Sequence, residues 1–245
     1  MNTRVALVTG ATRGIGAEVA SRLATEGWDL VITARSAGPL EEFATELAAR
    51  TGQQVTAVEA DLAAESAAEV IGARFDREHT RLDALVLNAG MGSIGAFDEF
   101  PLRRLDKLLA VNVRASYGLI QRMLPVLRMT GAKSDHGARV IALSSMTGIA
   151  AEPLNSAYGA SKAALTSLCE TLTLEEHRNG IGATAVCPGY VATDMTVGLA
   201  ETIEHSEMIR VSDVAEVVMS VTRLSKSVTI PYIPMTRPGP NLWRA

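Results

Sequence analysis

The sequence has few cysteines, few aromatic residues and little net charge, and these shortages exclude several classes of protein. Only Cys169 and Cys187 occur among 245 residues, and neither belongs to a Cys-x-x-Cys pair. A disulfide framework is therefore excluded, and a reducing compartment is expected. The 23 Lys and Arg residues nearly balance the 27 Asp and Glu residues, and they form no basic cluster that would predict nucleic acid as the main partner. No apolar stretch approaches the roughly 20 residues that span a bilayer, and the first strand-like run, at 5–8, starts too early for a signal peptide. We therefore expect a cytoplasmic protein with no membrane partner.

Apolar residues, by contrast, are abundant, at 47% of the chain, which is too many for a disordered protein. Short β-branched runs predict strands at 5–8, 30–33, 55–58, 85–87, 140–143, 183–186 and, less regularly, 228–230. Between them, apolar residues at three- and four-residue spacing predict helices, including 16–26, 40–50, 64–79, 102–129 and 155–178. Nearly continuous apolar strands indicate a sheet covered on both faces. The alternation of strand and helix therefore predicts an α/β fold with a doubly wound parallel sheet.

No repeat, low-complexity tract or linker divides the chain, so residues 1–245 are expected to form a single domain. The segment 130–137 is predicted to be a polar surface loop. The tail 231–245 contains four prolines and is predicted to be irregular. In open α/β sheets, ligands bind at the carboxyl ends of the strands, so the residues that follow each strand are the candidates for chemistry.

A glycine-rich turn follows the first strand and leads directly into a helix. It reads Thr9-Gly10-Ala11-Thr12-Arg13-Gly14-Ile15-Gly16. Its glycines would permit a tight turn and let backbone N–H groups approach an anion, to which the helix N-terminus adds its dipole. An ordinary strand-to-helix turn is the alternative, and a P-loop is excluded because no Gly-Lys-Ser/Thr follows. The position between strand and helix favours a dinucleotide site.

Two arginines favour NADP over NAD at this site. A fold that prefers NAD places an acidic side chain at the end of the second strand, whereas an arginine there accommodates a 2′-phosphate. This sequence has Arg35 at that point, and Arg13 in the glycine turn could reach the same phosphate. Either arginine alone could equally be a solvated surface residue.

Tyr158 and Lys162 lie four residues apart in the helix that follows the fifth strand, so they share one helix face. An adjacent ammonium favours the phenolate, which would move the tyrosine pKa from about 10 toward the working pH. General acid–base catalysis requires such a match. The alternative is an exposed Tyr and Lys without any function.

The order of these motifs resembles that of the short-chain dehydrogenases/reductases. The Thr-Gly-x-x-x-Gly-x-Gly turn, Asn88-Ala89-Gly90, Ser145, the Tyr158-x-x-x-Lys162 pair and Pro188-Gly189 follow one another as in that family, over roughly residues 4–225. The resemblance is strongest to the classical branch and implies one Rossmann-like domain with a seven-stranded parallel sheet. It also implies that hydride passes between a nicotinamide cofactor and a carbonyl or alcohol.

The resemblance assigns catalytic roles to four residues. Tyr158 would exchange a proton with the reacting oxygen, and Lys162 would lower its pKa and bind the nicotinamide ribose. Ser145 would hold the reacting oxygen, with Ser144 as the alternative. Asn112 would hold a water of a proton relay, although alone it would be interpreted as a helix-kink or surface residue.

The resemblance also implies the cofactor-binding residues. Asp61 and Leu62 would contact adenine, although Asp61 could simply cap a helix, and Asn88–Gly90 would lie beneath the adenosine ribose unless they form a plain turn. Pro188, Gly189, Val191 and Thr193 would hold the nicotinamide carboxamide. The full set implied for the cofactor is Gly10, Thr12, Arg13, Gly14, Ile15, Gly16, Arg35, Asp61, Leu62, Asn88, Ala89, Gly90, Tyr158, Lys162, Pro188, Gly189, Val191 and Thr193.

The expected function is therefore that of an NADP(H)-dependent carbonyl reductase. A 3-oxoacyl-(acyl carrier protein) or acyl-CoA reductase and a non-catalytic dinucleotide-binding regulator are the alternatives. Leu174 and His136 stand where acyl-carrier reductases often have arginines, which weakens the first alternative.

The expected substrate is small and partly apolar, because the segment 193–212 reads as an amphipathic lid. A homo-oligomer is expected, although the tail lacks the Gly-rich end typical of tetramers, so dimer and tetramer both remain open. The four histidines are scattered, and no metal is predicted.

Overall fold

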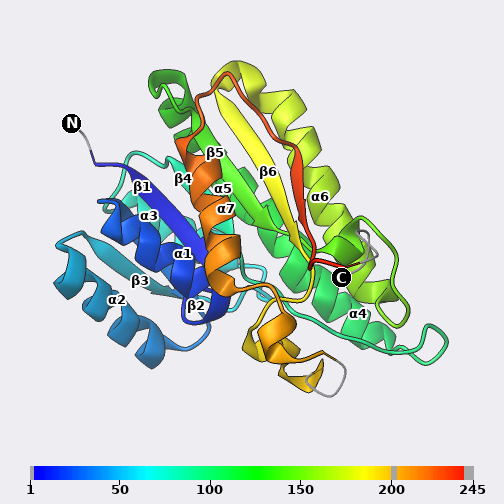
Figure 1. Cartoon of the computed structure of the whole chain (residues 1–245). Helices are drawn as coiled ribbons and strands as arrows, with labels where there is room; N and C mark the ends of the chain where they lie inside the picture. Colours follow the sequence, from blue (N-terminus) through cyan, green and yellow to red (C-terminus); the bar gives the residue numbers. More distant parts are fainter. Residues whose placement is uncertain (1–2, 200–202, 240–245) are drawn as a thin grey trace.

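A seven-stranded parallel sheet forms the centre of the computed structural model, which describes residues 3–199 and 203–239 (Figure 1). The strands follow the order β3-β2-β1-β4-β5-β6-β7. They are β1 (Val5–Thr9), β2 (Asp29–Ala34), β3 (Val55–Glu59), β4 (Ala84–Leu87), β5 (Ala138–Leu143), β6 (Ile181–Pro188) and β7 (Tyr232–Met235). The chain builds outward from β1 to β3 and then restarts at β4 on the other side of β1. This confirms the predicted doubly wound, Rossmann-like fold.

Helices cover both faces of the sheet. They are α1 (Gly14–Thr25), α2 (Ala37–Thr51), α3 (Ala67–Asp76), α4 (Leu102–Leu109), α5 (Ala115–Lys133), α6 (Ser156–Glu176) and α7 (Val211–Arg223). In Figure 1, α1, α2 and α7 lie in front of the sheet, while α3, α5 and α6 lie behind it. Each layer encloses its own hydrophobic core. In β5, for example, Val140 and Ala142 belong to one core and Ile141 and Leu143 to the other. A strand buried on both faces must be apolar at every position, which explains the continuous apolar runs.

The last strand corrects two sequence-based predictions. Residues 228–230 are not a strand, and the tail is not irregular throughout, because β7 lies within it at Tyr232–Met235. β7 pairs in parallel with β6 alone, and Pro234 stands opposite Cys187. A proline lacks the N–H that an inner strand needs on both sides, but an edge strand tolerates it. Residues 240–245 lie outside the described residues.

The segment 130–137 is a loop, as predicted, only from Ser134 onward, because α5 extends into it as far as Lys133. Thr130 is buried, and its hydroxyl accepts a hydrogen bond from the backbone N–H of Leu82 at 2.9 Å. Thr130 therefore satisfies a donor in the connection that leads into β4. Tertiary packing outweighs the polar composition of this segment.

The predicted helix 102–129 is also not uniform. α4 passes through a short π-helical segment, Ala110–Arg114, before α5 begins. Such single π turns occur frequently at functional sites, and Asn112 lies in this one.

Candidate active site

The glycine turn connects β1 to α1 at the carboxyl ends of the neighbouring strands β1 and β4. The strand order reverses between these two strands, which is where a doubly wound sheet opens a ligand crevice. Gly10 has φ +65°, and a Cβ there would lie 2.9 Å from the Cα of Ala89. A Cβ on Gly16 would lie 2.3 Å from the carbonyl oxygen of Gly10. Both positions therefore require glycine, and α1 begins at Gly14 with its free N–H groups at the crevice.

Hydrogen bonds from β4 hold this turn in place. Thr9 Oγ1 accepts from the backbone N–H groups of Asn88 and Ala89, each at 3.0 Å. Asn88 Nδ2 in turn donates to the carbonyl oxygens of Thr9 and Gly10, each at 3.0 Å. Asn88 and Ala89 are thus anchors of the glycine turn, and Thr9 is a positioning residue that the sequence analysis left without a role. The sequence feature that could have identified Thr9 is its polar side chain at the end of an otherwise apolar strand.

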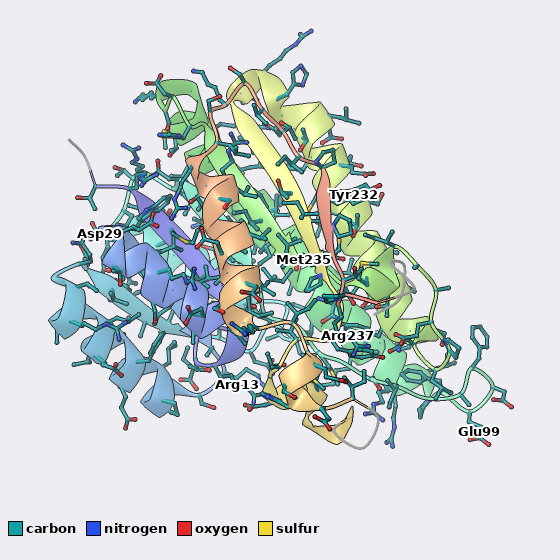
Figure 2. All side chains as sticks on the ribbon, viewed as in Figure 1. Arg13, Asp29, Glu99, Tyr232, Met235 and Arg237 are labelled. Carbon is teal, nitrogen blue, oxygen red and sulfur yellow. The ribbon has the colours of Figure 1, made fainter. Side chains whose placement is uncertain are left out.

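The two candidate phosphate-binding arginines are both accessible. Arg35 is exposed just beyond β2, and no carboxylate within the described ranges pairs with it. Arg13 is also exposed, and its guanidinium pairs with Asp194 at 3.0 Å across the crevice (Figure 2 labels Arg13). An exposed pair of this kind is worth little, so either arginine is available to an anion.

The remaining residues of the cofactor set lie around the same crevice. Thr12 and Ile15 are partly buried in the turn, and Asp61 is exposed after β3 and accepts a hydrogen bond from the N–H of Ala63 at 3.0 Å. Asp61 therefore closes a local turn rather than capping a long helix. Leu62 packs against one of the cores.

Tyr158 and Lys162 lie in the first two turns of α6, beside the end of β5. Lys162 Nζ is 5.7 Å from the centre of the Tyr158 ring and donates a 2.6 Å hydrogen bond to the carbonyl oxygen of Leu143. The Ser145 hydroxyl lies close enough to the Tyr158 side chain to influence its pKa. The serine, the phenol and the ammonium therefore meet at the carboxyl end of β5.

The neighbouring Ser144 faces away from this group. Its hydroxyl donates to the carbonyl oxygen of Lys162 and also bonds Thr166, each at 2.9 Å. Ser145 Oγ instead accepts from Thr147. Of the two serines, Ser145 is therefore the one placed to contact a reacting group, and Ser144 holds the backbone that carries Lys162.

Burial shifts the pKa values of both titratable residues. It raises the pKa of Tyr158 to about 12, and the Ser145 hydroxyl opposes part of this rise. It lowers the pKa of Lys162 to about 8, while Cys187 acts in the opposite direction. The expected lowering of the Tyr158 pKa by Lys162 is thus wrong for this structure. The physical reason is that the Lys162 ammonium bonds the Leu143 carbonyl and lies well away from the phenol ring.

Asn112 is buried in the π-helical segment and lies near Lys162. Its amide both accepts from and donates to the backbone of Met91, at 2.8 and 3.0 Å, and it donates to Ser161 at 2.9 Å. A Cβ on Gly90 would lie 3.3 Å from Lys162 Nζ and 3.5 Å from Asn112 Oδ1. Gly90, Asn112 and Lys162 therefore adjoin one another, and Asn112 joins the segment after β4 to α6.

The segment after β6 closes the other side of the crevice. Pro188 ends β6, and the N–H of Gly189 bonds the carbonyl oxygen of Met235 at 2.8 Å. Val191 bridges to Ile209, and the side chain of Thr193 lies 3.5 Å from where a Cβ on Gly14 would be. The glycine turn, predicted to bind the phosphates, and the segment after β6, predicted to bind the nicotinamide, therefore face each other across the crevice. Met195 follows, exposed, and residues 200–202 of the predicted lid lie outside the described residues.

The described part of the chain holds no group of three or more His, Cys, Asp or Glu residues that could bind a metal ion. None of its helices is both long enough and apolar enough to cross a membrane.

Comparison with known proteins agrees with this geometry. The chain matches the short chain dehydrogenase family over residues 4–204. It is 37% identical over 198 residues to the rhamnolipids biosynthesis 3-oxoacyl-(acyl-carrier-protein) reductase of Pseudomonas aeruginosa, covering 80% of this chain and 76% of that protein. The structure resembles the Pseudomonas aeruginosa RhlG/NADP active-site complex with a TM-score of 0.84 and 31% identity, over 95% of this chain and 94% of that one. It also resembles an alcohol dehydrogenase from Thermococcus sibiricus complexed with 5-hydroxy-NADP, with a TM-score of 0.86 and 25% identity, over 97% and 100% of the two chains. The chain therefore belongs to the short-chain dehydrogenase/reductase family.

Proposed function

We propose that this chain interconverts a carbonyl compound and a secondary alcohol with NADP(H), using Tyr158 as the general acid and base. The observation that carries the proposal is the meeting of Ser145, Tyr158 and Lys162 at the end of β5, beside the glycine turn. A regulator that only bound dinucleotide would have no need for these three groups together.

The residues present fit a dinucleotide. The space that a Cβ would fill at Gly10 and Gly16 lets a phosphate approach the backbone, and the N-terminus of α1 favours its charge. Arg13 and Arg35 can both pair with a 2′-phosphate, which favours NADP over NAD. Two similar solved structures carry NADP or an NADP derivative, which supports the same choice.

Proton transfer is assigned to Tyr158. When bound, the cofactor supplies or accepts the hydride at the carbonyl carbon. In the direction of reduction the carbonyl oxygen takes a proton from the Tyr158 hydroxyl, while Ser145 Oγ holds that oxygen by a hydrogen bond. Because its pKa is raised to about 12, Tyr158 is protonated at neutral pH and is ready to act as the acid. Lys162 adjoins this group and would bind the nicotinamide ribose. Asn112 keeps the loop after β4 against α6 and would hold a relay water beside Lys162.

The test compares the wild type with Tyr158→Phe. We expect the variant to bind NADPH with nearly unchanged affinity and to lose turnover on a panel of ketones and aldehydes, because only the acid is removed. Tyr232→Phe, at an exposed tyrosine on β7, is the matched control and should behave as the wild type. Normal turnover in Tyr158→Phe would refute the mechanism. Tight NADPH binding by the wild type without turnover of any carbonyl or alcohol would instead favour the non-catalytic regulator.

A reductase of 3-oxoacyl thioesters is the second candidate, supported by the name of the 37% identical relative. Leu174 is exposed on α6 and His136 precedes β5, so neither offers the permanent positive charge that an acidic carrier protein would attract. Assays with a 3-oxoacyl-CoA, the same acyl group on acyl carrier protein and a free ketone would separate the two candidates. A strong preference for the carrier-bound substrate would favour the second.

We also propose that the chain works as one domain and as a homo-oligomer in the cytoplasm. Both cysteines are free and buried, which suits a reducing compartment. We propose that α4, α5 and α6 form the contact between subunits, because the apolar side chains of Leu109, Tyr117, Met129 and Leu174 are exposed on these helices. Light scattering after size exclusion tests this, and a monomeric mass at micromolar concentration would refute it.

A further inference from the structure

A polar cluster lies between the segment after β6 and the loop that leads into α6, and the reaction mechanism does not use it. Tyr190, just after Pro188-Gly189, donates a 2.6 Å hydrogen bond from its hydroxyl to Glu152 Oε1. Asn155, at the start of α6, donates to Glu152 Oε2 at 2.9 Å. Glu152 lies in the loop between Ser145 and Tyr158, so this cluster joins two walls of the crevice.

The segment after β7 supplies the fourth member of the cluster. Beyond β7, the guanidinium carbon of Arg237 lies 6.0 Å from the centre of the Tyr190 ring. Figure 2 labels Arg237 near Met235, whose carbonyl oxygen anchors the N–H of Gly189 at 2.8 Å. β7 thereby carries an arginine from the end of the chain to the segment that is expected to hold the nicotinamide.

In this cluster the Glu152 carboxylate has hydrogen-bond partners, whereas the Arg237 guanidinium has no anionic partner among the described residues. Each carboxylate oxygen of Glu152 already has a side-chain donor. The Tyr190 pKa is raised, first by burial and then by this carboxylate, so its hydroxyl keeps its proton and remains a donor. Arg237 is only partly exposed, its Nε is buried with no hydrogen-bond partner, and no carboxylate in the described residues lies within ion-pair distance. A partly buried guanidinium without an anion is an incomplete site.

We propose that Arg237 binds a carboxylate of the carbonyl substrate, so that the preferred substrates are oxo acids rather than neutral ketones. Tyr190 supports the guanidinium through its ring, and the Tyr190–Glu152 bond fixes that ring. This inference rests on the proposed function and specifies its substrate class. The proposed anion-binding residue, Arg237, thus lies after β7 and is separate in sequence from Ser145 and Tyr158.

The experiment uses matched acids and esters as substrates of the full-length enzyme with NADPH. Pyruvate, acetoacetate and levulinate are each compared with their methyl esters, because the series varies the distance between the carbonyl and the carboxylate. For the wild type we expect one acid to exceed its ester in kcat/KM. In Arg237→Gln, that acid-to-ester ratio should fall about ten- to a hundredfold, the range expected for losing a hydrogen bond between charged groups. Arg237→Lys should restore part of the ratio, because it keeps the charge but not the bidentate geometry.

Two controls separate this role from other uses of the arginine. Arg178→Gln removes an exposed arginine on the 3-10 turn after α6 and should leave the ratio unchanged. The NADPH dissociation constant and the oligomeric mass of Arg237→Gln should equal those of the wild type. A weaker NADPH affinity or an altered mass would overturn the inference, because the arginine would then serve the cofactor or a second copy of the chain.

The outcomes also distinguish this inference from the proposed function. Turnover of the esters with an acid-to-ester ratio that Arg237→Gln does not change would overturn the carboxylate site and leave the reductase intact. If the wild type turns over no substrate, calorimetric binding of the acids and esters to the NADP⁺-saturated protein decides the matter. Tighter binding of an acid that is lost in Arg237→Gln would support the site, and equal binding of acid and ester would overturn it.

Discussion

Replacing Lys162 by methionine should change how the stability of the protein depends on pH. The Lys162 side chain is buried, and burial lowers its pKa from the model-compound value of 10.5 to about 8. Between these two pH values the unfolded chain holds a proton on this residue that the folded chain has released. Stability therefore rises with pH across this window, and the burial of the charge costs most at pH values below 8.

The size of the effect follows from the shift. The difference between 10.5 and about 8 is about 2.5 pH units, and each unit corresponds to about 1.4 kcal/mol, so the full window is worth about 3 to 4 kcal/mol. Tyr158 acts in the opposite direction above pH 10, because its pKa rises from 10.0 to about 12 on folding. The useful window is therefore pH 8 to 10, over which wild type should gain about 2 to 3 kcal/mol relative to Lys162→Met.

The assay is urea unfolding, followed by circular dichroism at several pH values between 7 and 10 without cofactor. The quantity compared is the difference in unfolding free energy between wild type and Lys162→Met, which cancels the titration of groups that do not interact with Lys162. Cys187 does interact with it, so Cys187→Ala is the background for both proteins. Lys226→Met, at an exposed lysine after α7, is the control and should leave the pH profile unchanged. A wild-type minus Lys162→Met difference that stays constant from pH 7 to 10 would show that Lys162 titrates normally and would refute the argument.

Two further changes test the cofactor half of the crevice. Thr9→Val leaves the two backbone N–H groups that follow β4 without their acceptor, which should lower stability by about 2 to 4 kcal/mol and weaken NADPH binding, as measured by urea unfolding and calorimetry. Thr9→Ser keeps the acceptor and should retain most of the affinity, and equal behaviour of the two variants would contradict the role of the hydroxyl. Arg35→Asp should shift the ratio of NADPH to NADH affinity toward NADH by tenfold or more, because a phosphate partner is replaced by a ribose-binding acid. Arg77→Asp, at another exposed arginine, should not change that ratio, and an unchanged ratio in Arg35→Asp would mean that the 2′-phosphate is bound elsewhere.

The strands and the glycine turn could be predicted from the sequence because their signals are local. Six strands are predicted within one or two residues, since a strand covered on both faces must be apolar at every position. The glycines of the first turn are likewise identifiable, because backbone contacts at Gly10 and Gly16 exclude any side chain. The α5 extension was missed because it depends on a buried contact between Thr130 and Leu82, 48 residues away in sequence.

The pKa of Tyr158 shows a second limit of sequence reasoning. A spacing of four residues correctly predicts that Tyr158 and Lys162 share a helix face, but not which acceptor the ammonium chooses. In the structure this acceptor is the carbonyl oxygen of Leu143, at the end of another element. The effect of Lys162 on the Tyr158 pKa therefore depends on where β5 ends relative to α6. A local sequence pattern does not contain this information.

The tail illustrates the same limit from the substrate side. Its prolines argue against regular structure, and yet Pro234 lies in a strand, because β7 occupies the sheet edge and needs hydrogen bonds on one side only. That edge position brings Arg237 to Tyr190, a residue 47 positions earlier in the chain. The residues proposed to hold the cofactor lie next to strands whose sequence is constrained by burial. The proposed substrate contact instead depends on a segment at the sheet edge that pairs with one neighbouring strand. Such a segment can change its side chains without disturbing either core, so substrate choice can vary while the cofactor crevice stays the same.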